Sequence, residues 1–308
     1  MDTRSGKKFR RSVILIVKNL SKTIDQLSVL NDIEFELTKN EVVGLVGRNG
    51  SGKTSLLRVL AGHYLPDIGD ILIGEKSVFK NPEVKQAIFF IDEKDNFLRS
   101  YSLTKIAKFY QLAYSKFDRS LFMDLVGKHE FSLNKSYRQL SKGQQALFQL
   151  ILAISSNAEY LLLDEPFDGL DVIIKKEMIG LLMEHLSEHS RTALISSHNL
   201  PELENLVDRV LLLKDQTIIK DYRLEEMREK AKKLQLVFKT KKVPAVVKEN
   251  SKMLDFQGRV VTVVFEHFTE ELETLIKEFD PLVYEELPLS LEDLFEANLK
   301  PHRKGPLK

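Results

Sequence analysis

An eight-residue stretch at positions 47–54, GRNGSGKT, constrains the fold of this chain more than any other feature. It has the form G-x-x-x-x-G-K-T and follows an apolar run at Val42–Val46, so it predicts a strand, a loop and a helix in that order. The glycines let backbone N–H groups converge on phosphate oxygens, and the N-terminus of the following helix favours an anion. Lys53 can then reach the β- and γ-phosphates of a nucleotide, and Thr54 can offer its hydroxyl to Mg²⁺.

The overall composition is typical of a globular protein, with 43% hydrophobic and 30% charged residues in a chain of 308, long enough for two domains. The net charge of +1 gives no field that favours nucleic acid or an anionic membrane. The absence of cysteine excludes disulfides and cysteine metal sites and fits a reducing cytosol. No apolar stretch approaches the roughly 20 residues that span a bilayer, so we expect a chain that does not cross the membrane.

The N-terminal region predicts a tail followed by strands. Residues 1–12 form a basic N-terminal tail, and a short apolar run follows at 13–17. The run stops at Lys18, too early for the hydrophobic region of a signal peptide, so we predict a core strand. Residues 29–37 predict a second strand.

The order of apolar segments after the loop indicates a parallel sheet. Residues 160–163 and 193–196 are typical of buried strands, and 171–188 predicts a helix between them. A strand, a helix and a strand in succession favour parallel pairing. The runs at 210–213 and 217–219 predict a closing hairpin.

A helical region is expected at residues 98–158, with helices at 103–114, 120–126 and 141–154. Just before it, the segment 92–101 carries Phe97, Leu98 and Tyr101 among charged residues. Two interpretations remain open for these apolar residues, a surface for a partner and packing inside the helical region.

The composition shifts near residue 223, and we expect residues 223–308 to form a linker and a small α+β domain. Residues 223–233 are highly charged and helical in character, which favours a linker. Strands are predicted at 234–238 and 260–265. Residues 270–279 predict an amphipathic helix with Leu272, Leu275, Ile276 and Phe279 on one face. Ser290 and Asp293 resemble a capping box that opens a last helix.

Four further motifs follow the loop. Leu140-Ser141-Lys142-Gly143-Gln144 precedes a helix, for which Ser141 is a natural N-cap that could also bind an anion. The strand at 160–163 ends in Asp164, which can hold the Mg²⁺ shell, and Glu165, which can polarise a water. The segment 167–171 follows at once, and His198 comes just after another strand. Each motif alone is also an ordinary helix start, acidic turn or polar loop.

Together, the motifs resemble the nucleotide-binding domain of ATP-binding cassette (ABC) transporters over about residues 13–222. In the family's terms, 47–54 match the Walker A loop, 160–165 match Walker B, 140–144 match the signature motif and 168–171 match the D-loop, while His198 matches the switch histidine. The resemblance implies an α/β fold, the P-loop NTPase ABC cassette. It would combine a mixed sheet core with an antiparallel β subdomain and a helical subdomain, followed by a small C-terminal α+β accessory domain.

The resemblance also implies roles for individual residues. Lys53, Glu165 and His198 would be catalytic, and Thr54, Asp164 and Glu93 would hold Mg²⁺. The residues expected to bind ATP are Gly47, Asn49, Gly50, Ser51, Gly52, Lys53, Thr54 and Ser55, joined by Ser141, Gly143 and Gln144 of a second protomer. Two positions depart from the family pattern: Ile24 stands where an aromatic residue often stacks on adenine, and Glu93 stands where a glutamine is usual.

The implied function is an ATPase that dimerises on ATP and drives export through a separate integral membrane permease, on the cytoplasmic face of the cell membrane. Lys142 in the signature motif and the segment 290–295 favour export over import. An importer ATPase and a soluble ABC ATPase acting on DNA or in translation remain alternatives. The single uninterrupted cassette argues against the second, and no nucleic-acid partner is expected. The sequence does not identify the cargo, nor whether the dimer is homomeric.

Overall fold

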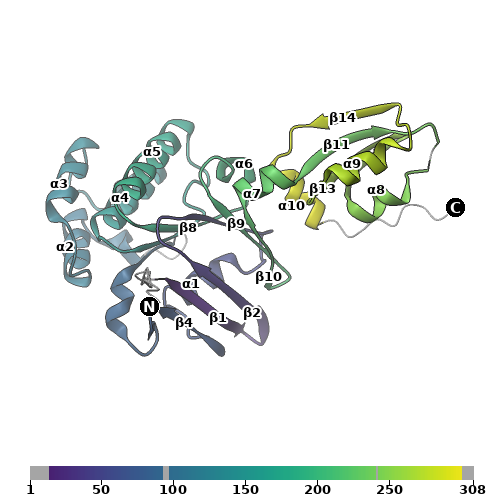
Figure 1. The fold of residues 1–308 in the computed structure, drawn as a ribbon. Helices are drawn as coiled ribbons and strands as arrows, with labels where there is room; N and C mark the ends of the chain where they lie inside the picture. Colours follow the sequence, from purple (N-terminus) through teal and green to yellow (C-terminus); the bar gives the residue numbers. More distant parts are fainter. Residues whose placement is uncertain (1–13, 93–96, 241, 300–308) are drawn as a thin grey trace, which may run out of the picture.

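A computed structural model of the protein describes residues 14–92, 97–240 and 242–299. The predicted N-terminal tail and the predicted metal ligand Glu93 lie outside the described residues. Figure 1 shows two parts: a larger one that contains both the antiparallel strands β1, β2 and β4 and the helices α2 to α5, and a smaller one formed by the end of the chain.

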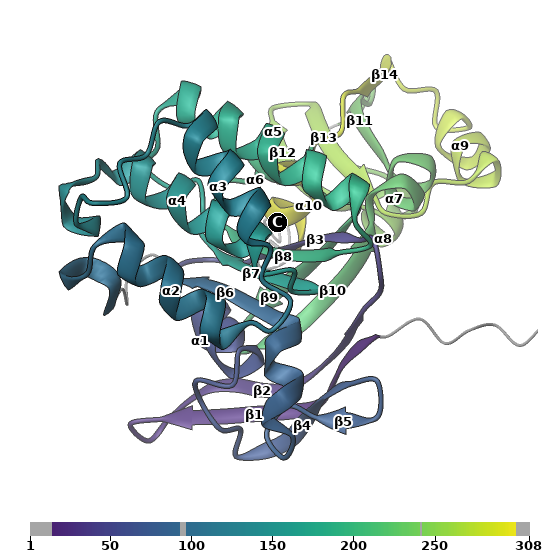
Figure 2. The ribbon, with the colours of Figure 1, turned by 90° about the vertical axis from the view of Figure 1, so that its left-hand side faces the viewer.

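A six-stranded sheet in the order β10-β9-β3-β8-β7-β6 forms the centre of the larger part (Figure 2). Neighbouring strands from β9 through β3, β8 and β7 to β6 run parallel to one another, and β10 pairs antiparallel with β9. The predicted parallel sheet and closing hairpin are therefore confirmed. The strands are β3 (Val42–Val46), β6 (Ile88–Asp92), β7 (Tyr160–Asp164), β8 (Thr192–Ser197), β9 (Arg209–Lys214) and β10 (Thr217–Arg223).

A second sheet, antiparallel and in the order β2-β1-β4-β5, packs beside the first. Its first strand continues well beyond the predicted end at Lys18, because an irregularity in the pairing after Val17 brings Leu20 back into the core while Lys18 stays exposed. The strands are β1 (Leu15–Ile24), β2 (Leu27–Leu37), β4 (Ile68–Ile73) and β5 (Lys76–Ser77). Ile24, at the end of β1, is partly exposed.

The helices of the larger part are α1 (Lys53–Leu60), α2 (Leu103–Ala113), α3 (Arg119–Lys128), α4 (Lys142–Ser155), α5 (Val172–Glu188), α6 (Leu200–Leu203) and α7 (Leu224–Lys230), with short 3₁₀ turns η1 (Pro82–Ala87), η2 (Phe97–Ser100) and η3 (Tyr137–Gln139). Helices α2, α3 and α4 lie where helices were predicted at 103–114, 120–126 and 141–154. Leu98 is buried in the core, which fits packing inside the helical region. Tyr101 is 47% exposed, which fits a surface for a partner.

The smaller part begins with β11 and has its own core, which includes Leu236, Val263, Phe265 and Ile276. Its sheet is antiparallel in the order β12-β13-β11-β14. The elements are β11 (Lys232–Val237), α8 (Ala245–Asn250), β12 (Lys252–Gln257), β13 (Val260–Phe265), α9 (Glu270–Lys277), β14 (Val283–Leu287) and α10 (Leu291–Leu299).

Two predictions for the end of the chain need correction. Helix α9 buries Leu272 and Ile276, whereas Leu275 and Phe279 are 46% and 51% exposed, because the neighbouring elements cover only the stripe of Leu272 and Ile276 and because Phe279 lies beyond the helix end. The predicted linker is helix α7, and its Leu224 and Met227 are buried in the core of the larger part.

A polar network around Glu266 joins the two parts. The Glu266 carboxylate accepts hydrogen bonds from Lys220 Nζ at 2.8 Å and Tyr222 Oη at 2.6 Å, both on β10. Lys252 Nζ and Asn298 Nδ2 donate to the same carboxylate, each at 3.0 Å. Four donors from two parts of the chain therefore converge on one acidic residue.

The last helix, α10, lies between the two parts (Figure 1). Its Ser290 and Asp293 form the predicted capping arrangement: Asp293 N donates to Ser290 Oγ at 3.2 Å, and Ser290 N donates to Asp293 Oδ2 at 2.9 Å. Leu291 and Leu294 are buried in the core of the larger part. The helix thus fastens the smaller part by apolar packing as well as by the Glu266 network.

Candidate site for nucleotide binding and hydrolysis

The loop at residues 47–54 connects β3, which is buried along its whole length, to α1. Gly52 caps the helix with φ of 108°, and a Cβ atom there would lie 2.6 Å from the carbonyl oxygen of Val29. At Gly47 a Cβ atom would lie 2.5 Å from the carbonyl oxygen of Leu213. At position 47 glycine is required because a neighbouring carbonyl oxygen leaves no space for a Cβ atom. At position 52 the same lack of space and the positive φ both require glycine.

Lys53 lies inside this loop and is only 6% exposed. Its Nζ donates a hydrogen bond to the carbonyl oxygen of Gly47 at 2.9 Å and lies 3.3 Å from Glu165 Oε1. The structure thus brings together two predicted site residues from segments more than a hundred positions apart. A buried ammonium group paired with one carboxylate can exchange that partner for the oxygens of a phosphate.

Glu165 also contacts His198. Its Oε2 lies 2.8 Å from His198 Nδ1 and accepts a hydrogen bond from the His198 backbone N–H at 3.2 Å. Ser196 fixes the backbone of Glu165, because Glu165 N donates to both the Ser196 carbonyl oxygen and Oγ, at 3.2 and 2.9 Å. Glu165 has φ of 47°, a left-handed conformation that is uncommon for a residue with a side chain. The three residues predicted to be catalytic therefore form one contact chain.

Asp164 is buried beside them, at the end of β7. Ser196 Oγ donates to its Oδ1 at 2.6 Å, and the Thr54 hydroxyl also hydrogen-bonds to it. Burial raises the pKa of Asp164 above its usual value, and the neighbouring carboxylates of Asp92 and Glu165 add to the rise, whereas the two hydroxyl hydrogen bonds oppose it. A cation bound beside Asp164 would offset the repulsion among the carboxylates of Asp164, Asp92 and Glu165.

The donor set fits a hard divalent cation. The Thr54 hydroxyl and the Asp164 carboxylate are oxygen ligands side by side, which is the chemistry that Mg²⁺ prefers. In the loop, Ser51 Oγ is buried and has no hydrogen-bond partner among the described residues, so a polar ligand can still be accommodated there. The third predicted ligand, Glu93, lies outside the described residues.

Sequence reasoning missed Arg58 and Asp92. Arg58 Nε and Nη2 donate to Asp92 Oδ2 at 2.9 and 2.7 Å, and Nη1 donates to Tyr64 Oη at 2.9 Å. Although burial acts to lower it, these bonds to Asp92 and Tyr64 raise the pKa of Arg58. Asp92 is paired with Asp164 in the register of β6 and β7, so it lies at the same sheet edge as the predicted metal ligands.

The signature segment begins α4. As predicted, Ser141 is the N-cap: Gln144 N donates to Ser141 Oγ at 3.2 Å and Ser141 N donates to Gln144 Oε1 at 3.1 Å. Among the described residues, no hydrogen bond joins Ser141, Gly143 or Gln144 to the loop at 47–54. Within one chain, therefore, hydrogen bonding does not link these two predicted binding segments.

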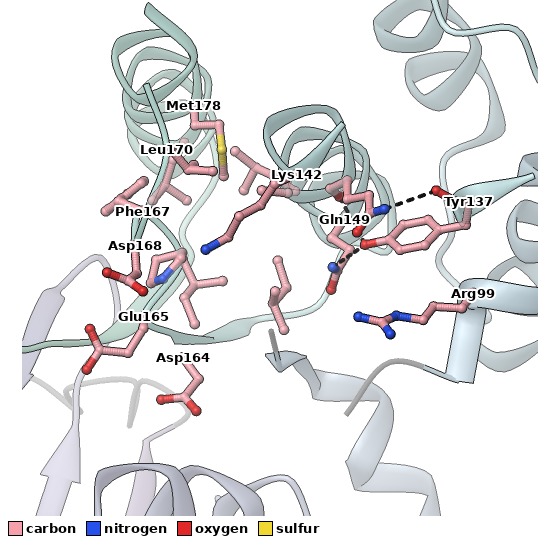
Figure 3. A pocket seen from close by; sticks show the side chains of 17 residues that line it. Arg99, Tyr137, Lys142, Gln149, Asp164, Glu165, Phe167, Asp168, Leu170 and Met178 are labelled. Atoms are coloured by element: carbon pink, nitrogen blue, oxygen red, sulfur yellow. Dashed lines mark hydrogen bonds between the residues drawn. The ribbon is translucent and has the colours of Figure 1, made fainter. Parts of the chain in front are cut away.

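A pocket of about 250 Å³ lies between α4 and the end of β7 (Figure 3). Arg99 and Lys142 bring positive charge to it, and Asp164, Glu165 and Asp168 bring negative charge. Among the residues the structure describes, those of the loop at 47–54 do not line it. The pocket is thus distinct from the loop that is predicted to bind phosphate, although it reaches the same two carboxylates.

Comparison with known proteins identifies the family of the chain. Residues 30–168 match the family model described as ABC transporter. Over 288 residues the chain is 33% identical to the ABC transporter ATP-binding protein YtrB of Bacillus subtilis (strain 168), covering 94% of this chain and 99% of that protein. The chain belongs to the ABC transporter family. It is the ATP-binding subunit of an ABC transporter, and an ATPase whose activity is coupled to transport.

Solved ABC cassettes share the fold. A structure of the ATP-binding subunit of an ABC transporter has a TM-score of 0.64 at 24% identity and covers 70% of this chain and 92% of that one. A dimeric bacterial ABC transporter cassette has a TM-score of 0.61 at 20% identity, covering 68% of this chain and 98% of that one. The predicted cassette fold is therefore confirmed.

Two findings bear on transport by this ABC subunit. Relatives whose names state a direction include importers and exporters alike. Within the part of the chain that the structure describes, every helix is too short or too polar to cross a membrane.

Proposed function

We propose that this ABC subunit hydrolyses ATP with Mg²⁺ and, as one half of an ATP-dependent dimer, drives export through a separate membrane permease. The observation that carries the chemistry is the position of Glu165, whose carboxylate oxygens lie 3.3 Å from Lys53 Nζ and 2.8 Å from His198 Nδ1. A carboxylate at a strand end, beside the lysine expected to contact phosphate, is well placed to orient a water.

In this proposal the γ-phosphate replaces Glu165 as the partner of Lys53, because both anions compete for one ammonium group. Glu165 then polarises the attacking water, and His198, which is 46% exposed, contacts the γ-phosphate. The residues that hold the phosphates are those of the loop: Gly47, Asn49, Gly50, Ser51, Gly52, Lys53, Thr54 and Ser55. Thr54 and Asp164, with Glu93, hold Mg²⁺, which offsets the negative charge of the phosphates.

The dimer is proposed because one chain covers the phosphates on one side only. Ser141, Gly143 and Gln144 make no hydrogen bond to the loop of their own chain, so we expect them to act on the ATP of a second protomer. Beside the D-loop, Val172 and Ile173 are 66% and 78% exposed, as residues of a protein interface often are. A bacterial cassette of the same fold is dimeric. The partner can be a second copy or a different ATPase.

The permease is expected to dock on the helical region, where the apolar residues Tyr101, Phe109 and Leu112 are 47%, 51% and 88% exposed. Export is favoured by Lys142 in the signature motif and by the segment 290–295. Import remains the alternative, and a soluble ATPase acting on DNA or in translation is a second one. With a net charge of +1, no nucleic-acid partner is proposed. The expected location is peripheral, on the cytoplasmic face of the membrane.

The variant Glu165→Gln tests the chemistry. It keeps the size of the side chain but removes the charge, so ATP should still bind while hydrolysis falls by a factor of about 10² or more. The variant should then accumulate as an ATP-bound dimer in light scattering. Lys53→Ala should instead lose ATP binding, and Glu225→Gln, at an exposed position, is the control. Normal hydrolysis by Glu165→Gln would falsify the assignment.

The direction of transport needs a separate experiment. The ATP-bound Glu165→Gln variant is used to isolate the transporter from membranes of the native host, and its subunits are identified. A complex that contains a polytopic membrane protein but no substrate-binding protein supports export. Recovery of a secreted substrate-binding protein in the same complex identifies an importer and overturns that part of the proposal.

A further inference from the structure

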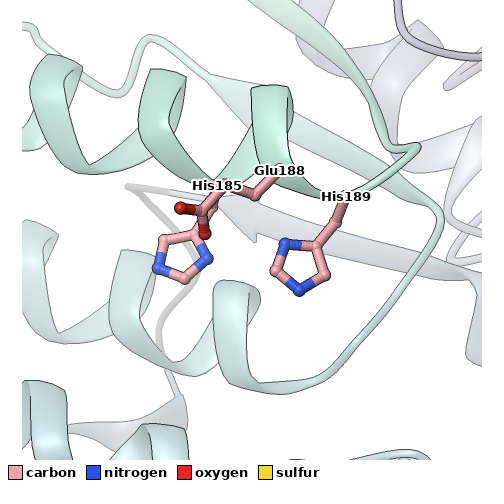
Figure 4. Close-up of side chains that lie close together, drawn as sticks. All are labelled: His185, Glu188 and His189. Atoms are coloured by element: carbon pink, nitrogen blue, oxygen red, sulfur yellow. The ribbon is translucent and has the colours of Figure 1, made fainter.

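A second cluster of chemically active side chains lies at the opposite end of α5. His185 and Glu188 belong to its last turn, and His189 is its C-cap residue. One ligand atom of each residue lies within 4.8 Å of the others. The spacing i, i+3 and i+4 places the three side chains on one face of the helix. Figure 4 shows ring nitrogens of His185 and His189 facing one another, with the Glu188 carboxylate beside the His185 ring.

The cluster is separate from the ATP site. Helix α5 ends at Glu188, and strand β8 begins at Thr192 and runs toward Ser197 and the catalytic edge. A strand of six residues spans about 17 Å from its first to its last residue. The cluster therefore lies near the opposite strand ends of the sheet from Asp164 and Glu165, and an ion bound there does not touch the nucleotide.

His185 has a nitrogen without a partner. The residue is 6% exposed, and its Nδ1 is buried without a hydrogen-bond partner among the described residues. A buried polar atom of this kind costs stability unless something ligates it. His189 and Glu188 are exposed, so a ligand can reach the cluster from solvent.

The charged neighbours of His185 decide whether a cation can approach the cluster. Glu184 and Glu188 supply negative charge near the ring. The positive charge of Arg191 is turned toward other partners, because its Nη1 donates to the carbonyl oxygen of Ile154 at 2.8 Å and its Nη2 donates to Asn157.

We propose that His185, Glu188 and His189 form a binding site for a divalent transition-metal ion of the zinc class. Two imidazoles and one carboxylate are ligands that Zn²⁺, Ni²⁺ and Cu²⁺ accept, whereas Mg²⁺ prefers oxygen ligands alone. Ligand atoms of a tetrahedral zinc site lie about 3.3 Å apart, and rotation of the exposed Glu188 and His189 side chains can close the cluster to that spacing. Water completes the coordination.

The predicted consequence is a more stable end of α5. The three ligands come from one helical turn and its cap, so a bound ion ties the helix terminus together just before the chain enters β8. An ion that binds the folded state and not the unfolded state raises the melting temperature as its concentration rises. The ion should have no direct effect on ATP hydrolysis, because the cluster is remote from the catalytic edge.

The test titrates ZnCl₂ into the untagged full-length chain, freed of metal by a chelator, and follows heat release and melting temperature. We expect one saturable site whose affinity falls about tenfold or more in His189→Ala and in His185→Ala. The His189→Ala variant is decisive because this side chain is exposed and its removal leaves the core intact. His267→Ala, at another exposed histidine, is the matched control and should bind as the wild type does.

Two results would overturn the proposal. One is the absence of saturable Zn²⁺ binding to the wild-type chain. The other is unchanged affinity in His189→Ala, which would place the bound ion elsewhere. Loss of binding in His189→Ala with retention in His267→Ala supports the site.

Discussion

Arg58 donates two hydrogen bonds to the same carboxylate oxygen of Asp92, at 2.9 and 2.7 Å. The pair ties α1, which begins in the Walker A loop, to the end of β6, one strand away from Asp164. The Asp92 side chain is 8% exposed and that of Arg58 is 19% exposed, so solvent screens the pair only weakly. It therefore sets the position of the helix that presents Lys53 and Thr54.

Asp92→Asn should destabilise the protein by about 3 kcal/mol, because it removes the negative charge of the carboxylate that Nε and Nη2 of the largely buried Arg58 side chain contact. The measurement is the free energy of unfolding in urea. Replacing both residues together, with Arg58→Met and Asp92→Leu, should restore much of the loss. Glu83→Gln breaks the exposed pair with Lys76 and should leave stability unchanged. Equal effects of Asp92→Asn and Glu83→Gln would contradict this account.

Gly47→Ala should distort the Walker A loop and weaken ATP binding by about tenfold or more, because its Cβ would collide with the Leu213 carbonyl oxygen. Gly127→Ala is the matched control. Gly127 lies in helix α3 and an added Cβ meets nothing within 4 Å, so this change should raise the free energy of unfolding by about 0.5 kcal/mol. Nucleotide titration and urea unfolding measure the two effects, and normal ATP affinity in Gly47→Ala would show that the loop has room to adjust.

Glu266 should make stability depend on pH. Burial acts in the opposite direction, but the bonds from Lys220, Tyr222, Asn298 and Lys252 lower the pKa of Glu266 from 4.5 to about 2. A carboxylate with a lowered pKa in the folded state contributes stability that is present above its unfolded pKa of 4.5 and is lost as the pH falls toward 2.

Glu266→Gln should therefore reduce the free energy of unfolding by about 2 kcal/mol at pH 7, and the difference from wild type should shrink between pH 4.5 and pH 2. Urea unfolding at several pH values measures it. Glu285→Gln, at an exposed position of the same sheet, should show no such trend. A constant difference at all pH values would mean that the charge of Glu266 is not what stabilises the junction.

Leu98→Ala and Leu112→Ala should separate folding from partner binding. Leu98 is 4% exposed, so its truncation should cost about 3 kcal/mol of stability. Leu112 is 88% exposed, so its truncation should leave the melting temperature unchanged and reduce co-purification with the permease. Undiminished recovery of the permease with Leu112→Ala would exclude this part of the helical region from the interface.

The sequence predicts those parts of the site that are continuous in the chain. The Walker A loop, the Asp164–Glu165 pair and the Ser141 cap are each set by neighbours within a few residues, and the structure has them where the motifs place them. Contacts between distant segments leave no local signal. Arg58 and Asp92 are 34 positions apart, and the donors around Glu266 span Lys220 to Asn298, so neither arrangement could be predicted.

Helix α9 shows a different limit. Its apolar residues have helical periodicity, but periodicity does not tell how wide a stripe the neighbouring sheet covers, and Leu275 is left exposed. The charged composition of α7 likewise predicts a linker, because it gives no sign that Leu224 and Met227 are buried in the core of the larger part.

The junction at Asn298 has a consequence for the order in which the protein is made. Lys214 Nζ donates to the Asn298 carbonyl oxygen across 84 positions, and Asn298 also reaches Glu266 and Tyr222. Because the chain emerges from the ribosome N-terminal end first, the sheet that carries the Walker motifs can assemble long before residue 298 has been synthesised. The contacts that join the two parts can therefore form only after residue 298 has emerged, and until that moment the cassette and the C-terminal sheet are tethered without being docked.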